Sequence, residues 1–130
     1  MKRIHTDEAP APAGHYSQAI EHGGLVFVSG QLPVTASGEA LAEAPIGEQT
    51  ALVMRNIGRI LDEAGSGLDR LLQVTIYVPD IAAWPEINAA YARVMGDARP
   101  SRAVIPVRAL HYGVGLEVQA VAATGAARLV

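Results

Sequence analysis

A few polar residues stand inside otherwise apolar segments of this 130-residue chain, and Arg102 is the most conspicuous of them. It enters the stretch RPSRAVIPV, and no Asp or Glu occurs between Asp97 and Glu117 to pair with it locally. A guanidinium stays protonated at ordinary pH, so it needs an anion or water wherever it points. The carboxylate of a ligand is one candidate partner, and a helix C-terminus or a carboxylate distant in sequence is another.

Other polar residues share this kind of setting. They stand next to the first long apolar run, within a predicted helix, or at alternate positions of the last predicted strand, where Glu117 and Gln119 share one face. Taken singly, each fits a surface residue, or one bonded to the backbone, better than a catalytic group. Only their combination indicates a site: Tyr16, Ser29, Gly30, Gln31, Asn88, Arg102, Glu117 and Gln119.

The common catalytic motifs are absent from the sequence. The four histidines never occur at metal-ligand spacing with one another or with a carboxylate, and there is no cysteine. No glycine-rich loop connects a strand to a helix in the pattern that cradles phosphate, and Ser29 lacks the flanking glycines of a nucleophile elbow. A metal site built from histidine or cysteine, a thiolate nucleophile and a Ser-His-Asp hydrolase are therefore not expected.

Apolar periodicity predicts the elements that must position these residues. A helix is expected over Ile46–Ala64, where apolar residues recur every three or four positions and Gly65 follows as a left-handed C-terminal residue. A second helix is expected over 84–95, with Pro85 in its first turn. Apolar and β-branched runs predict strands at 25–29, 71–78, 102–107 and 116–123, after an extended Pro- and Ala-rich arm. This order predicts a single α+β domain over residues 1–130, with two layers and helices on one face of the sheet.

Composition narrows the possible partners. Half of the residues are hydrophobic and only 18% are charged, so part of the surface is expected to be covered by another subunit. The formal charge of −3, with scattered basic residues, argues against nucleic acid as a partner. No apolar run is long enough for a membrane span, and the N-terminus has no apolar signal segment, which makes the cytoplasm the expected location.

Five stretches in order resemble the RidA (YjgF) family of reactive-intermediate deaminases, over about Ile4 to Ala123. The family pattern G-P-Y-S-Q-A is matched by Gly14–Ala19 with histidine in place of proline, and S-G-Q-[IL]-P is intact at Ser29–Pro33. The patterns V-N-x-x-Y and P-x-R-[SA] are matched by Ile87–Tyr91 and Pro100–Ala103. The last segment of the family pattern, V-E-I-E-A-I-A, is similar to Leu116–Ala122.

The resemblance implies a chorismate-mutase-like fold and a homotrimeric barrel with ligand clefts between subunits. It implies hydrolysis of enamines and imines, such as 2-aminoacrylate and 2-iminopropionate, to 2-keto acids and ammonium, with no cofactor. The family arginine that grips the substrate carboxylate matches Arg102. Tyr16, Ser29 and Asn88 match cleft positions, and backbone groups around Gly30 and Val104 are expected to help hold the substrate or water.

Gln119 departs from the family pattern at the second Glu of the last segment, a residue expected to position or activate water. A carboxamide can orient water but cannot accept a proton near neutral pH. The departure leaves open a carboxylate-binding or interaction trimer that has lost efficient hydrolysis. His15 or His111 could replace the base, or both could be plain loop residues. A ribonuclease activity is a third alternative, which the acidic charge disfavours.

Overall fold

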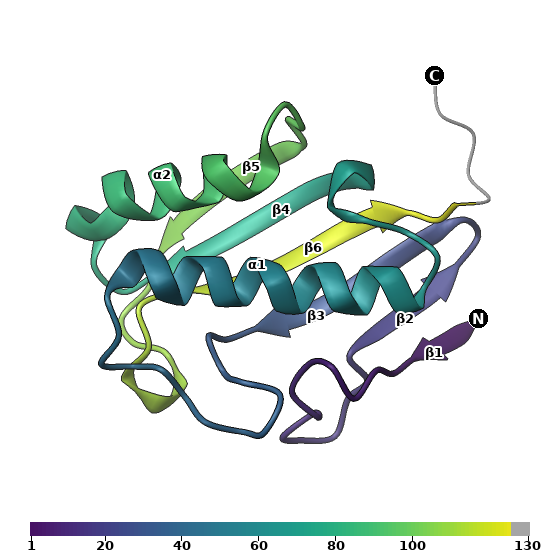
Figure 1. The fold of residues 1–130 in the computed structure, drawn as a ribbon, viewed down its shortest axis with the longest axis horizontal. Helices are drawn as coiled ribbons and strands as arrows, with labels where there is room; N and C mark the ends of the chain where they lie inside the picture. The colour runs from purple at the N-terminus through teal and green to yellow at the C-terminus, as the bar shows by residue number, and fades with distance from the viewer. Residues whose placement is uncertain (126–130) are drawn as a thin grey trace.

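The computed structural model describes residues 1–125, which form one six-stranded sheet with two α-helices against it (Figure 1). Neighbouring strands are antiparallel except for the last pair in the sheet, β4 and β5. A parallel pair needs a long crossover, and the segment that contains the second helix supplies it. In sheet order the strands are β1 (Lys2–Ile4), β2 (Ala19–His22), β3 (Leu25–Gln31), β6 (Glu117–Ala123), β4 (Leu71–Val78) and β5 (Ser101–Pro106).

Both helices, α1 (Ile46–Glu63) and α2 (Trp84–Met95), lie side by side on the same face of the sheet (Figure 1). The expected end of α1 is confirmed, because Gly65 has a φ of 73° and Ser66 N donates to Leu61 O. Pro85 occupies the first turn of α2, where its missing N–H costs no helical hydrogen bond. The expected α+β architecture, with two layers and helices on one face, is therefore confirmed.

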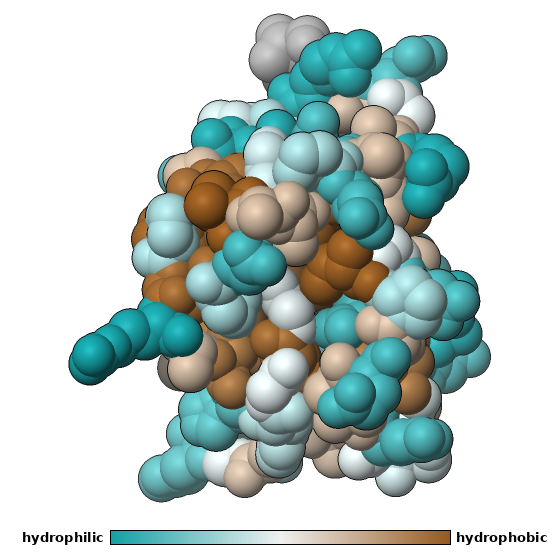
Figure 2. All heavy atoms as spheres, turned by 90° about the vertical axis from the view of Figure 1, so that its left-hand side faces the viewer, coloured by the Kyte–Doolittle hydropathy of each residue, from teal (hydrophilic) through white to brown (hydrophobic). Residues whose placement is uncertain are grey.

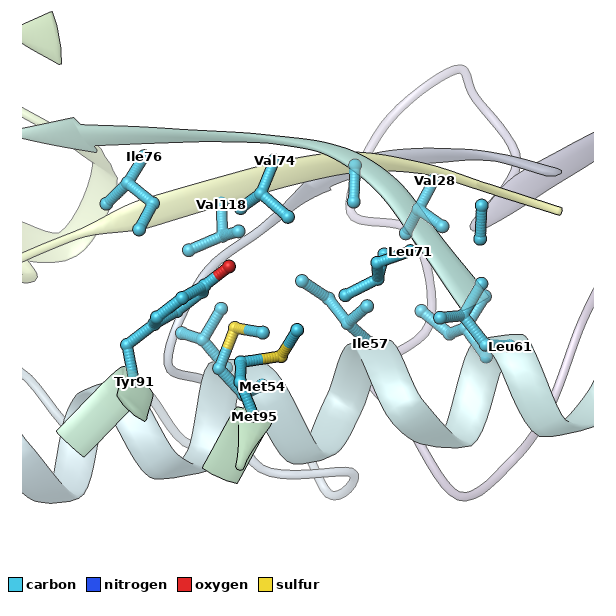
Figure 3. Packing of buried hydrophobic residues seen from close by; sticks show 14 of the residues in the cluster. Val28, Met54, Ile57, Leu61, Leu71, Val74, Ile76, Tyr91, Met95 and Val118 are labelled. Atoms are coloured by element: carbon cyan, nitrogen blue, oxygen red, sulfur yellow. The ribbon is translucent and has the colours of Figure 1, made fainter. Parts of the chain in front are cut away.

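The core fills the space between the helices and the sheet (Figure 3). Side chains on one stripe of α1 and on the facing side of α2 point toward alternate residues of the central strands. Because this layer is almost wholly excluded from water, it fixes the two helices against the sheet and so fixes the polar residues that they carry. The residues labelled in Figure 3 are Val28, Met54, Ile57, Leu61, Leu71, Val74, Ile76, Tyr91, Met95 and Val118.

The opposite face of the sheet carries no helix (Figure 1). Large apolar side chains on that face are open to solvent in the single chain, with Phe27 46% and Ile105 39% exposed. Apolar side chains also reach the surface in adjoining patches at the end where both helices begin (Figure 2). In the single chain, the sheet is therefore covered on one face only.

The sequence-based expectations differ from the structure mainly at the N-terminus. Strands β1 and β2 were not predicted, because three or four residues are too short to show an alternating pattern. The Pro- and Ala-rich arm is consequently a connection between these two strands and not a leading segment. The other strands and both helices lie within two residues of their expected bounds. Residues 126–130 of the expected domain lie outside the described residues.

Among the helices of residues 1–125, none is long and apolar enough to cross a membrane.

Candidate functional site

Arg102 is held by three side chains of α2. It lies on the edge strand β5, and its guanidinium carbon is 4.8 Å from the ring centre of Trp84 and 4.9 Å from that of Tyr91. Its Nη1 donates a hydrogen bond of 3.0 Å to Asn88 Oδ1. Cation–π contacts of this kind fix the plane of the guanidinium without neutralising its charge. Arg102 is therefore oriented, and it has no carboxylate partner within the described part of the chain.

Tyr91 adds a buried phenol to this group. Burial raises the pKa of Tyr91, and the positive charge of Arg102 offsets part of that rise. The phenol is neutral around neutral pH, so Arg102 is the charged group among these side chains of α2 and β5. Beside it lies a hollow of about 370 Å³, lined by Asn88, Tyr91 and Arg102 together with residues of the loop that follows α2.

A second set of expected site residues lies at the end of β3. A β-bulge between Val28 and Gln31 interrupts the pairing of β3 with β6 and sets Gly30 beside Glu117. A Cβ atom on residue 30 would lie 3.1 Å from Glu117 Cδ and closer still to its Oε2. Glycine is thus required for the carboxylate to approach this backbone. The sequence placed Glu117 among the polar residues that together indicate a site, but the role at the water was expected at position 119 and not at Glu117.

Ser29 and Tyr16 lie close to this bulge. The Ser29 hydroxyl donates to Ser17 O at 2.6 Å and its amide donates to Gln18 O at 2.9 Å, so its polar atoms join two segments of backbone. Tyr16 is 50% exposed, and its phenol oxygen accepts a hydrogen bond from Ala13 N. Tyr16 and Gly30 line a cavity of about 340 Å³, which Tyr112 also lines.

The expected site residues therefore fall into two groups on one chain. Tyr16 and Gly30 line one cavity, whereas Asn88 and Arg102 line the other, and neither Ser29 nor Val104 is among the lining residues of either. Val104 is half-buried on β5, in register with the core residue Ile76 of β4. Within the single chain, these residues therefore line two separate cavities and not one shared site.

Gln119 lies on the uncovered face of the sheet, two residues from Glu117. Its side-chain oxygen accepts a hydrogen bond of 2.6 Å from the Tyr77 hydroxyl, and the residue is exposed. Arg102, in contrast, contacts α2 on the helix-covered side of the sheet. The structure thus does not bring Gln119 and Arg102 together within one chain.

Two features of this arrangement were missed in the sequence, and only the first of them left a signal there. Trp84, Asn88 and Tyr91 follow the i, i+4, i+7 spacing of one helix face, so their common contact with Arg102 could have been predicted. Tyr112 gave no such signal, because its role depends on the φ of 63° that places it at the cavity. His15 and His111 are both exposed, and within residues 1–125 no three metal-ligating side chains cluster.

Comparison with known proteins gives consistent results. The family model described as Endoribonuclease L-PSP matches residues 6–124. A RutC family protein of Pyrococcus abyssi is 38% identical over 119 residues, which cover 92% of this chain and 94% of that protein. E. coli TdcF with bound serine superposes with a TM-score of 0.90 at 30% identity, covering 96% of this chain and all of the other. RidA of an Antarctic Psychrobacter superposes with a TM-score of 0.89 at 30% identity, covering 95% and 99%.

Proposed function

Because this chain belongs to the YjgF/RutC/RidA family, we propose that it is a deaminase that hydrolyses the imine or enamine of a small 2-amino acid. Water adds to the C=N carbon of the imine, and the nitrogen leaves as ammonia, which takes up a proton to become ammonium. The product is a 2-keto acid. An enamine such as 2-aminoacrylate enters the same reaction after tautomerisation to 2-iminopropionate.

The observation that carries this proposal is the presentation of Arg102. An oriented guanidinium that has no carboxylate partner among residues 1–125 can bind a planar carboxylate through two parallel hydrogen bonds. Substrates of the proposed reaction carry that carboxylate next to the reacting carbon. Holding the carboxylate therefore also sets the position of the C=N bond. Because an imine is already reactive toward water, this positioning supplies most of the catalysis that its hydrolysis requires. The bound serine of TdcF, a 2-amino acid, is chemically consistent with this substrate class.

Glu117 is the residue that we assign to the water. Its carboxylate lies against Gly30, in the group that contains Tyr16. A carboxylate in this position can accept a hydrogen bond from water and take its proton as the new C–O bond forms. Gln119 was expected to act there, but its oxygen is already engaged by Tyr77, so its catalytic role stays an untested prediction and Glu117 replaces it in the proposal.

A homotrimer completes the site in this proposal. The Arg102 group of one copy would meet the Gly30 and Glu117 group of the next, and the uncovered sheet face would line the inside of a closed barrel. A cyclic assembly with head-to-tail contacts creates identical sites from two different surfaces of the chain. In this proposal the reaction needs no cofactor. We also propose that the protein acts in the cytoplasm.

Two other functions compete with this one. A trimer that binds small carboxylates without hydrolysing imines was suggested by Gln119, and the nearby Glu117 weakens that argument because a carboxylate is retained. An endoribonuclease is suggested by the family description. The formal charge of −3 disfavours it, since binding to phosphate backbones depends on clustered positive charge.

Turnover of 2-iminobutyrate, generated in situ and followed by formation of the 2-keto acid, tests the proposal. Wild-type protein should accelerate hydrolysis, and Arg102→Ala should lose most of this acceleration. Wild type that is inert toward imines but binds 2-oxobutyrate would support the binding trimer. Cleavage of RNA without imine turnover would support the endoribonuclease, and imine activity that survives Arg102→Ala would refute Arg102 as the anchor.

A further inference from the structure

The cavity that contains Tyr16 and Gly30 extends well beyond the atoms that the proposed reaction uses. Its walls come from the Pro- and Ala-rich connection between β1 and β2, the loop that follows β3, and Tyr112. Its volume of about 340 Å³ falls within the ~300–1,000 Å³ range of small-molecule pockets. A three-carbon imino acid would fill only a small part of this space, so the cavity is larger than the smallest substrates need.

Two buried amides hold these walls in place. Gln18 is 1% exposed; its Oε1 accepts from Thr6 N, and its Nε2 donates to Thr6 O and to Pro10 O. Asn56 of α1, which is fully buried, donates to Val34 O in the opposite wall at 2.8 Å. Because buried hydrogen bonds of this kind are costly to break, the cavity is a fixed feature of the fold.

The lining of the cavity is uncharged. None of its residues is Asp, Glu, Lys, Arg or His, and most of the others are apolar. Apart from Tyr112, the polar side chains among them already make hydrogen bonds: Gln18 with the backbone, Gln31 with Ser29 O, Tyr16 with Ala13 N, and Ser37 with Thr35. A charged side chain of a ligand would be desolvated here without compensation, whereas an apolar one would displace water from apolar walls.

Tyr112 holds an unusual backbone conformation at this cavity. Its φ of 63° and ψ of 9° are left-handed, which is rare for a bulky residue, and Gly113 immediately after it is left-handed too, with a φ of 69°. Tyr112 is 59% exposed and still lines the cavity. Strain at a ligand site of this kind is a pointer to function, because it places an aromatic ring where a relaxed backbone would not.

We propose that this cavity is the subsite for the substrate's side chain, and that Tyr112 makes it selective for bulky apolar side chains. The inference rests on the proposed function, because the carboxylate and the reacting carbon are held by Arg102 and Glu117. Imines of branched, thioether or aromatic 2-amino acids are then better substrates than 2-iminopropionate. Imines with acidic or strongly basic side chains are excluded.

Binding of the stable 2-keto acids tests the subsite without catalysis. Calorimetric titration of the assembled protein should give at least about tenfold tighter binding of phenylpyruvate or 4-methyl-2-oxopentanoate than of pyruvate, and weaker binding of 2-oxoglutarate than of either bulky acid. Tyr112→Asn keeps a residue that tolerates the left-handed backbone and should remove most of this preference. Tyr112→Phe, the matched control, should retain it.

A second variant acts on the same subsite without touching Tyr112. Ala36→Phe adds bulk to the lining of the cavity and should weaken binding of phenylpyruvate while leaving pyruvate unchanged. Equal affinities for pyruvate and the bulky acids, or a preference that survives both Tyr112→Asn and Ala36→Phe, would overturn the subsite alone. The proposed function, and the subsite with it, would be overturned if wild type bound no keto acid or if Arg102→Ala bound the keto acids as tightly as wild type.

Discussion

The exchange of one carboxylate on β6 tests the assignment of the water-activating group. Glu117→Gln keeps the size of the side chain, so it keeps the contact with Gly30, but it removes the proton acceptor. General-base catalysis contributes about 10²–10⁴-fold, so kcat for 2-iminobutyrate should fall by roughly 10²-fold or more, equivalent to about 2.7 kcal/mol of barrier. The KM should change little, because Arg102 still binds the carboxylate.

Gln119→Glu is the matched control on the same strand. The new carboxylate can still accept the hydrogen bond from Tyr77, and it lies away from Arg102 in the single chain. We expect kcat to stay within about threefold of wild type. Steady-state rates of keto-acid formation measure both variants under the same conditions. Full activity in Glu117→Gln, or a gain of about tenfold or more in Gln119→Glu, would refute the reasoning and return the role to position 119.

Gly30→Ala is an independent test of the role of the Glu117 carboxylate. The backbone of Gly30 has no left-handed φ, so alanine adds no backbone strain there, but its Cβ would meet the Glu117 carboxyl group. The carboxylate must then swing away, and kcat should fall as in Glu117→Gln while stability changes by only about 1 kcal/mol or less. Unaltered kcat in a folded Gly30→Ala protein would argue against a role for the carboxylate at this position.

Other substitutions test the neighbouring features. Arg102→Lys keeps the charge but loses the planar two-bond contact, so kcat/KM for 2-iminobutyrate should fall by roughly 10-fold or more; a wild-type value would show that charge alone suffices. Tyr112→Asn relieves the left-handed conformation, and urea denaturation should show a gain of about 1 kcal/mol, whereas a loss would mean that the ring is a structural support. Because burial raises the pKa of Tyr91 above its ordinary value of 10.0, its neutral form stabilises the fold below pH 10, and this stability is lost as the pH rises through that value and above it. Tyr91→Phe should therefore show a smaller decline of unfolding free energy above pH 10, and an identical decline would contradict the shift.

Much of the fold followed from periodicity in the sequence. The apolar spacing of α1 and the β-branched runs of β3, β4 and β6 mark long elements, whose burial patterns repeat often enough to be recognised. Strands β1 and β2 carry no such repeat and are defined by pairing with neighbours that are distant in sequence. Tertiary pairing of that kind is not encoded in any local pattern.

The candidate site was predicted only in part, because some of its contacts depend on tertiary pairing and not on local sequence. Arg102 could be selected from its sequence because a cation in an apolar run needs a partner, and a family pattern identified its neighbours. The proximity of Glu117 to Gly30 depends on the β-bulge of β3, and no pattern in the sequence predicts that bulge. Period two places positions 117 and 119 on one face of the strand but cannot decide which of them lies next to the site.

The measurement that tests the central proposal most directly is activity in mixed assemblies of Arg102→Ala and Glu117→Gln. Each variant alone should be almost inactive. If each site takes Arg102 from one copy and Glu117 from the next, random co-assembly in equal amounts restores about a quarter of the sites, since each intact residue is present with a chance of one half. Recovery of roughly a quarter of wild-type activity, with co-assembly verified by mass spectrometry, is the predicted result. No recovery in verified mixed assemblies would contradict a site built between copies.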